Sequence, residues 1–182
     1  MPRADDNVLP VRVPRNAKPL VPVTADRLRS LRKHLVRTLR DARELKWVSA
    51  PCPPPPSGFA AWVADTACGL CEGWCCRHGG DDGYLDGHAM ARVCREMPDL
   101  DAGAVVRLYS KQVPAIAYEG SCIFHGAQGC TLDRSLRADI CNSYFCGGLA
   151  AYFKSGDEDS PRVVVAGEGD AMRSSALLAP RV

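Results

Sequence analysis

Apolar residues recur at helical spacing in one long segment near the start of the chain. From Thr24 to Trp47 they return every three or four residues, which places them on one face of a helix. The residues of this stripe are Leu28, Leu31, Leu35, Leu39, Ala42 and Leu45. Thr24 or Asp26 would cap the first turn, because short polar side chains bind its unpaired N–H groups. We therefore predict an amphipathic helix within residues 24–50.

Two shorter helices follow from cap and stop signals further along the chain. Asp86 precedes a stretch of helical periodicity that ends at Pro98, and Asp101 precedes a second one that ends at Pro114. Cys94 lies on the apolar face of the first of these helices. A buried free cysteine behaves as a small hydrophobic residue, so we interpret Cys94 as a packed thiol and not as a ligand.

The remaining pattern is more broken. Residues 115–132 form a short extended stretch in which glycines mark turns, and residues 161–167 offer one final strand. A last helix is expected over much of residues 134–153, bent or interrupted at the double glycine 147–148. The sequence thus predicts a small α+β protein that is mostly helical and loop-rich.

Composition divides the chain into four parts. Residues 1–23 contain five prolines and no periodicity, and we predict a flexible arm there. Residues 24–50 hold the basic amphipathic helix, and the proline run at 51–56 forms a stiff linker that contains Cys52. Residues 57–182 form the cysteine-bearing domain. Because Cys52 lies in the linker, we do not expect it to be a ligand.

Ten cysteines in 182 residues need an explanation in binding or in pairing. A chain of this length can bury a real core, so disulfides are not required for stability. The start carries charges and prolines where a secretory signal would be apolar, and no run approaches the roughly 18 apolar residues of a membrane span. We therefore expect a cytoplasmic protein with no membrane contact, in which clustered thiols bind metal; disulfide pairing stays a minor alternative.

Eight cysteines fall into two dense groups. They are Cys68, Cys71, Cys75, Cys76, Cys122, Cys130, Cys141 and Cys146. The two-residue spacing of the first pair lets both sulfurs meet one ion. Eight thiols suffice for two four-sulfur sites, or for one cluster with additional ligands.

Two cysteine pairs raise a geometric question. Cys75 and Cys76 are adjacent, so their side chains diverge. They serve different metals, or one binds a metal and the other packs. Cys141 and Cys146 are five residues apart, about 140° around an ideal helix. They can share a metal only if the helix ends or kinks between them.

Histidines near the cysteines are further ligand candidates. His125 could replace a sulfur or complete a site with an open position, and we include it in the predicted ligand set. The alternative is an exposed loop residue beside a glycine. For His78 we favour that exposed interpretation.

The segments "CGLCEGWCC" (68–76) and "CIFHGAQGCTLDRSLRADICNSYFC" (122–146) resemble the YkgJ-type cysteine-cluster family, which is described as a zinc- or iron-chelating domain. The resemblance covers residues 66–149. It implies that all eight cysteines of the two groups are metal ligands, and that the fold is organised around this cysteine-ligated metal centre. It implies no substrate or pathway.

Thiolate sites suit both zinc and iron–sulfur clusters, because both are soft partners for sulfur. We predict a zinc- or iron-chelating protein. One alternative is an iron–sulfur redox protein or enzyme, for which Tyr109, Tyr118 and Tyr144 lie nearby in the sequence. No Ser-His-Asp arrangement, phosphate loop or dinucleotide fingerprint is present, so we assign no catalytic residue.

Charge favours a third interpretation. Residues 1–46 hold 12 Lys and Arg against 5 Asp and Glu, a net charge of +7, while residues 47–182 hold 11 against 16, a net charge of −5. A basic helix of this kind is typical of phosphate contact. The alternative function is a zinc-stabilised adaptor in which residues 24–46 bind nucleic acid or protein. The acidic body could equally dock the helix within the chain.

Overall fold

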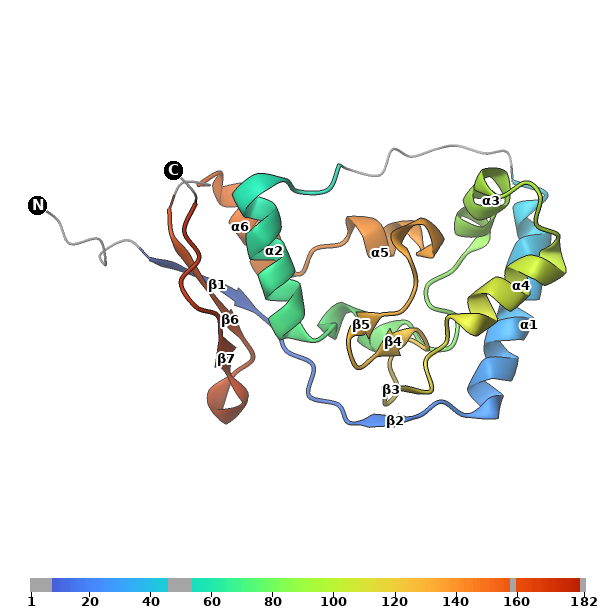
Figure 1. Cartoon of the computed structure of the whole chain (residues 1–182), viewed down its shortest axis with the longest axis horizontal. Coiled ribbons are helices and arrows are strands. Elements are labelled where there is room, and N and C mark those ends of the chain that lie inside the picture. The colour runs from blue at the N-terminus through green and yellow to red at the C-terminus, as the bar shows by residue number, and fades with distance from the viewer. Residues whose placement is uncertain (1–7, 46–53, 158–159, 181–182) are drawn as a thin grey trace, which may run out of the picture. The chain divides into compact units, whose positions relative to one another are not determined.

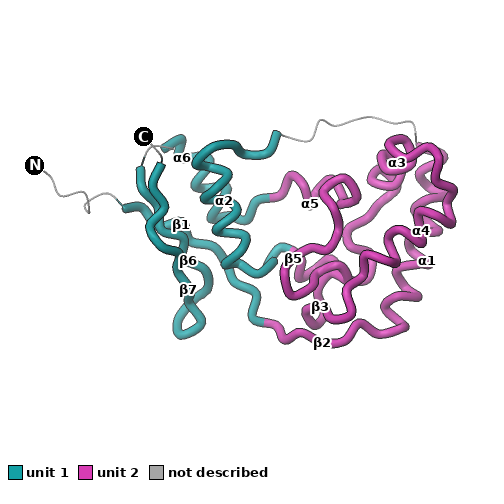
Figure 2. The backbone as a smooth tube through the Cα atoms, viewed as in Figure 1, with its two compact units in different colours: residues 1–17, 53–75, 145–182 teal, residues 18–52, 76–144 magenta. Residues whose placement is uncertain are grey.

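The computed structural model describes residues 8–45, 54–157 and 160–180 (Figure 1). They form a small α+β protein in which about 47% of the described residues are helical and the sheets are small. The chain divides into two compact units, residues 1–17, 53–75 and 145–182 (unit 1) and residues 18–52 and 76–144 (unit 2) (Figure 2). No helix within the described ranges is long and apolar enough to cross a membrane.

Unit 1 is a three-stranded sheet with helices packed on it (Figure 1). Its strands are β1 (Leu9–Val13), β6 (Arg162–Ala166) and β7 (Arg173–Ser174), with β6 in the middle, parallel to β1 and antiparallel to β7. Its helices are α2 (Gly58–Cys71), α6 (Gly147–Ser155) and the 3-10 helix η3 (Gly169–Ala171). Alternate residues of β6 are buried under α2, as expected for a strand with one covered face.

The predicted flexible arm differs from the structure. Residues 9–13 form β1, which pairs in register with β6 about 150 positions later, from Leu9 opposite Arg162 to Val13 opposite Ala166. Val11 and Val13 alternate toward the core of unit 1 and are buried. The proline-rich composition concealed a short period-2 pattern whose partner lies at the other end of the sequence.

Unit 2 is mainly helical. Its helices are α1 (Ala25–Ala42), α3 (Gly87–Glu96), α4 (Ala102–Lys111), the short α5 (Asp139–Ser143) and the 3-10 helix η2 (Arg134–Leu136). Two antiparallel ribbons join β2 (Leu20–Pro22) to β3 (Ile116–Tyr118) and β4 (His125–Gly126) to β5 (Gly129–Cys130). The 3-10 helix η1 (Trp74–His78) contains the boundary between the two units.

The stripe on α1 forms the centre of the core of unit 2. Leu31, Leu35 and Leu39 are buried against α3 and α4, so the basic helix is an integral part of this unit and not a separate extension. Thr24 caps α1 by accepting the backbone N–H of Arg27, as predicted. The structure likewise confirms the caps of α3 and α4. The predicted division into a helix and one domain of residues 57–182 differs from the two units that the structure contains.

The expected last helix is broken into η2, α5 and α6. Tyr144 and Cys146 are extended, and α6 begins at the double glycine instead of bending there. Gly148 has a packing reason, because a Cβ there would lie 1.7 Å from the carbonyl oxygen of Arg12 in β1. The glycine lets α6 approach the strand backbone closely.

Candidate metal centre

Four cysteines of unit 1 come from the end of α2, from η1 and from the start of α6. Cys68 and Cys71 lie three residues apart in the last turn of α2, on one face. Cys75 follows in η1, and Cys146 is the N-cap residue of α6. Partial burial of the Cys68 thiol raises its pKa to about 11, with smaller contributions from Cys75, Cys71 and Cys146. Cys68 therefore interacts electrostatically with the other three thiols of this unit.

The turn after α2 directs backbone N–H groups at a sulfur. Glu72 and Gly73 have left-handed backbone angles, with φ of 53° and 73°. The N–H of Trp74 then points back and donates to Sγ of Cys71 at 3.4 Å. Burial raises the pKa of Cys71, while the N–H groups of Trp74 and Gly73 lower it. Such N–H···S contacts favour the thiolate, the form that binds metal.

Glu72 is held in its strained conformation by two arginines of unit 1. Its carboxylate forms ion pairs with Arg15 at 2.8 Å and with Arg173 at 3.1 Å. Non-glycine residues with positive φ persist where surrounding contacts fix them. The two ion pairs therefore help to fix the turn that carries Cys71.

The cysteines of unit 2 gather around Cys122, which is 6% exposed. Its backbone N–H donates to the carbonyl oxygen of Cys76 at 2.9 Å, and the hydroxyl of Ser121 donates to the same oxygen at 3.0 Å. Burial raises the pKa of Cys122 to about 12; the N–H of Phe124 lowers it, and Cys130 and Cys141 raise it. The segment 121–124 thus carries a buried sulfur with an N–H donor and two cysteine neighbours.

Gly79 allows the loop after Cys76 to approach Cys122. A Cβ at Gly79 would lie 2.7 Å from Cβ of Cys122 and 2.9 Å from the ring of Tyr84. Any side chain at this position would press on the cysteine. The glycine is therefore part of the packing around this sulfur.

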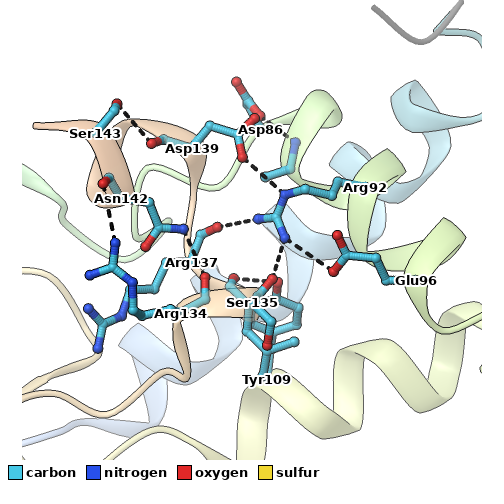
Figure 3. A network of polar contacts seen from close by, with 12 residues as sticks. Asp86, Arg92, Glu96, Tyr109, Arg134, Ser135, Arg137, Asp139, Asn142 and Ser143 are labelled. Atoms are coloured by element: carbon cyan, nitrogen blue, oxygen red, sulfur yellow. Dashed lines mark hydrogen bonds and ion pairs between the residues drawn. The ribbon is translucent and has the colours of Figure 1, made fainter. Parts of the chain in front are cut away.

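Cys141 lies in α5, and one arginine anchors the segment that leads to it. Figure 3 shows the side chain of Arg92 reaching from α3 toward Glu96 and Asp139. Its guanidinium donates to the carboxylate of Asp139 at 3.0 Å and to the carbonyl oxygens of Ser135 and Arg137. A single half-buried cation thereby fixes the backbone on the N-terminal side of α5.

Two further contacts complete the network of Figure 3. The hydroxyl of Tyr109, which is fully buried, donates to the carbonyl oxygen of Leu136 at 2.7 Å. Arg134 and Asn142 exchange hydrogen bonds with each other's carbonyl oxygens. Hydrogen bonds to residues before and after Cys141 therefore hold the backbone of this short helix. The side chain of Cys141 itself is exposed.

His125, included in the predicted ligand set, is fully buried and not an exposed loop residue. Its Nδ1 shares a hydrogen bond with the hydroxyl of Ser121 at 2.8 Å, and its ring lies against Tyr118 with 4.5 Å between centroids. These contacts describe a packed histidine, and a ligand role for it stays a prediction. His78 is exposed, Cys94 is half-buried in α3, and Cys52 lies outside the described residues.

The thiols are gathered but do not enclose an ion as they stand. Among the described residues, no three His, Cys, Asp or Glu side chains converge in metal-binding geometry, and all the described cysteines are free thiols. The donor set itself fits zinc or an iron–sulfur cluster, because it is all sulfur and two of its sulfurs accept backbone N–H groups.

Residues that support the cysteines were missed by the sequence analysis. Arg27 lies off the apolar stripe of the basic helix, so its sequence position favours the solvent-facing side. Instead its side chain forms an ion pair with Asp81 at 2.6 Å and donates to the carbonyl oxygen of Ser121, also at 2.6 Å. No local sequence signal distinguishes Arg27 or Arg92 from surface arginines, because the carbonyl groups that they bind are 43 to 94 positions away.

No family model, curated protein or solved structure matches the chain. The assignment of a function therefore depends on the cysteines and on their surroundings.

Proposed function

We propose that the chain is a metal-binding protein that chelates zinc or iron through its eight clustered cysteines. The observation that carries the proposal is the setting of the two buried cysteines, Cys71 and Cys122. The Sγ of Cys71 accepts the backbone N–H of Trp74, the backbone of Cys122 is hydrogen-bonded to that of Cys76, and each of the two thiols has other cysteines as electrostatic neighbours. Neutral core thiols require neither feature, whereas thiolate ligands gain from both.

The choice of metal determines what the protein can do. Four thiolates around zinc form a closed, redox-inactive site, which contributes apparent binding free energies of about 10–16 kcal/mol in small zinc domains. An iron–sulfur cluster on the same sulfurs would supply electron transfer. In both cases the side chains of this chain hold the group, and the arginine network keeps Cys141 in place.

Metal analysis of the full chain, purified without oxygen, tests this proposal. Zinc or iron should be present at one or more equivalents per chain, and prior alkylation of the cysteines should abolish binding. A colourless zinc protein identifies the mononuclear site. Broad visible absorbance with iron and acid-labile sulfide identifies a cluster. Protein that retains no metal, and takes up none after reduction and addition of zinc or iron, contradicts the proposal.

A second candidate function is an adaptor whose metal holds the fold while a basic surface binds a partner. A groove of about 470 Å³ lies between α1 and α4 in unit 2. Its apolar part includes Val36 and Val106, and its cations are Arg40, Arg43 and Arg107. Within the described residues, none of these three guanidinium groups forms an ion pair or side-chain hydrogen bond. The combination favours an acidic protein segment that also carries an apolar side chain.

This adaptor function has its own test. Alanine at all three groove arginines should abolish binding of an acidic, leucine-containing peptide while leaving metal content unchanged. Alanine at Arg29, an exposed arginine elsewhere on α1, is the matched control. Equal peptide binding by both variants contradicts the adaptor function. Loss of nucleic-acid binding instead of peptide binding would assign the surface to phosphates.

A further inference from the structure

We propose that the eight cysteines form two separate four-sulfur metal centres, one within each unit. The inference rests on the proposed metal-binding function and adds the number of centres and their ligands. The ligands in unit 1 are Cys68, Cys71, Cys75 and Cys146. The ligands in unit 2 are Cys76, Cys122, Cys130 and Cys141.

The unit boundaries divide the eight clustered cysteines equally. One boundary falls between residues 75 and 76, and the next falls between residues 144 and 145. The first separates the adjacent Cys75 and Cys76, and the second separates Cys141 from Cys146. In η1 consecutive side chains point about 120° apart, because a 3-10 helix has about three residues per turn. Each unit thereby holds four of the eight, the number of thiolates that one zinc ion or one cluster requires.

The unit 1 set and the unit 2 set of cysteines are arranged in the same way. Each contains one buried cysteine that a backbone hydrogen bond anchors: the Sγ of Cys71 accepts the N–H of Trp74, and the N–H of Cys122 donates to the carbonyl oxygen of Cys76. The other members of each group are half-buried or exposed, with Cys68, Cys75 and Cys141 exposed. A repeated arrangement of one anchored sulfur and three more accessible ones is expected of two equivalent centres. A single cluster with accessory ligands would need only one anchor.

Each group also joins segments of its own unit that are distant in sequence. In unit 1, α2 and η1 would be linked to the start of α6 through Cys146. In unit 2, the end of η1 would be linked to the β4–β5 ribbon and to α5. Cys76 belongs with the latter, because its carbonyl oxygen accepts the backbone N–H of Cys122. Each metal would therefore cross-link one unit.

The test uses the unmodified full chain, reduced and loaded anaerobically with one equivalent of zinc. The free thiols are alkylated with N-ethylmaleimide, and the one-metal species is selected by native mass spectrometry and fragmented. We expect each molecule to protect one complete set of four, either the unit 1 set or the unit 2 set. Protected sets that mix the two, such as Cys71 with Cys122, overturn the inference.

Serine variants at one exposed ligand of each set provide the second readout. Cys68→Ser and Cys141→Ser should each lower the maximum load from two metals to one and leave the protection of the other set intact. Cys94→Ser, at a cysteine outside both sets, should keep two metals. If either ligand variant loses all metal while the parent binds one, the cysteines form one centre; the proposed function stands and this inference fails. If the parent binds no metal, both fail.

Discussion

At the scale of single residues, arginine is the side chain that organises the cysteine segments. Arg27 binds the carbonyl oxygen of Ser121, which precedes Cys122, and Arg92 binds carbonyl oxygens in the segment that leads to Cys141. Arginine suits this task because its planar guanidinium offers five donors in a fixed geometry. The positions of these cysteine segments therefore depend on arginines at other places in the sequence.

Replacement of Arg92 by Gln should destabilise the protein by about 1.5–3 kcal/mol, because charged hydrogen bonds are lost and carbonyl groups are left unpaired. Urea denaturation of the metal-free protein measures this. Transfer of zinc to a chelator should also be faster, since the segment that carries Cys141 loosens. Arg95→Gln, on an exposed part of the same helix, should change stability by less than about 0.5 kcal/mol. Equal effects of the two variants would show that Arg92 does not anchor the segment that carries Cys141.

Tyr109 gives a pH-dependent prediction. Burial raises its pKa well above the usual value of about 10, so the folded protein keeps the phenol neutral while the unfolded chain ionises. This contribution to stability is fully present below pH 10 and is lost as pH rises above it. Thermal unfolding between pH 8 and 11 should show a fall in stability that is shallower in Tyr109→Phe. An identical alkaline slope in both proteins would contradict this assignment.

At the scale of elements, local signals predicted the helices of unit 2, whereas long-range pairing escaped prediction. Thr24, Asp86 and Asp101 cap helices because their side chains bind N–H groups two or three residues on. The pairing of β1 with β6 joins residues about 150 positions apart, and nothing in either segment names its partner. The same limit applies to the cysteines. Their spacing indicated metal binding, but their division into a unit 1 set and a unit 2 set depends on where each segment packs.

The double glycine tests the packing of α6 on β1. Gly148→Ala should destabilise unit 1 strongly, by more than about 3 kcal/mol, because the added Cβ overlaps the carbonyl oxygen of Arg12 and the backbone must shift. Gly147→Ala is the matched control, since nothing lies within 4 Å of its added Cβ. Its stability should stay within about 1 kcal/mol of the parent or rise, because alanine favours helix. Similar denaturation midpoints for the two variants would contradict the close approach.

Arg27 links the basic helix α1 to the segment that carries Cys122. Arg27→Ala should lower stability by about 1.5–3 kcal/mol and weaken metal retention by the cysteines of unit 2, because the carbonyl oxygen of the buried Ser121 loses its donor. Arg29→Ala removes an exposed cation that pairs with Asp26 within the helix and should be nearly neutral. Calorimetry and metal content of the two variants provide the comparison. If Arg27→Ala changes neither stability nor metal content, the basic helix is a separable extension.

The whole chain comprises two small compact units. Bound metal is one of the ways in which small units gain stability beyond that of their hydrophobic cores. Metal binding would add to folding free energy in both, because the sulfurs come from distant segments that the unfolded chain does not hold together. Each unit would then gain stability from its own metal. The unit 1 and unit 2 sets of cysteines are adjacent in sequence only at Cys75 and Cys76.

X-ray absorption at the metal edge, on the full chain loaded to saturation, tests for two four-sulfur centres. Two zinc ions per chain should each show about four sulfur neighbours near 2.3 Å and no nitrogen or oxygen shell. An iron protein should show a sulfur shell together with iron–iron scattering from a cluster. A first shell dominated by nitrogen or oxygen, or an average of two sulfurs per metal, would contradict two four-sulfur centres.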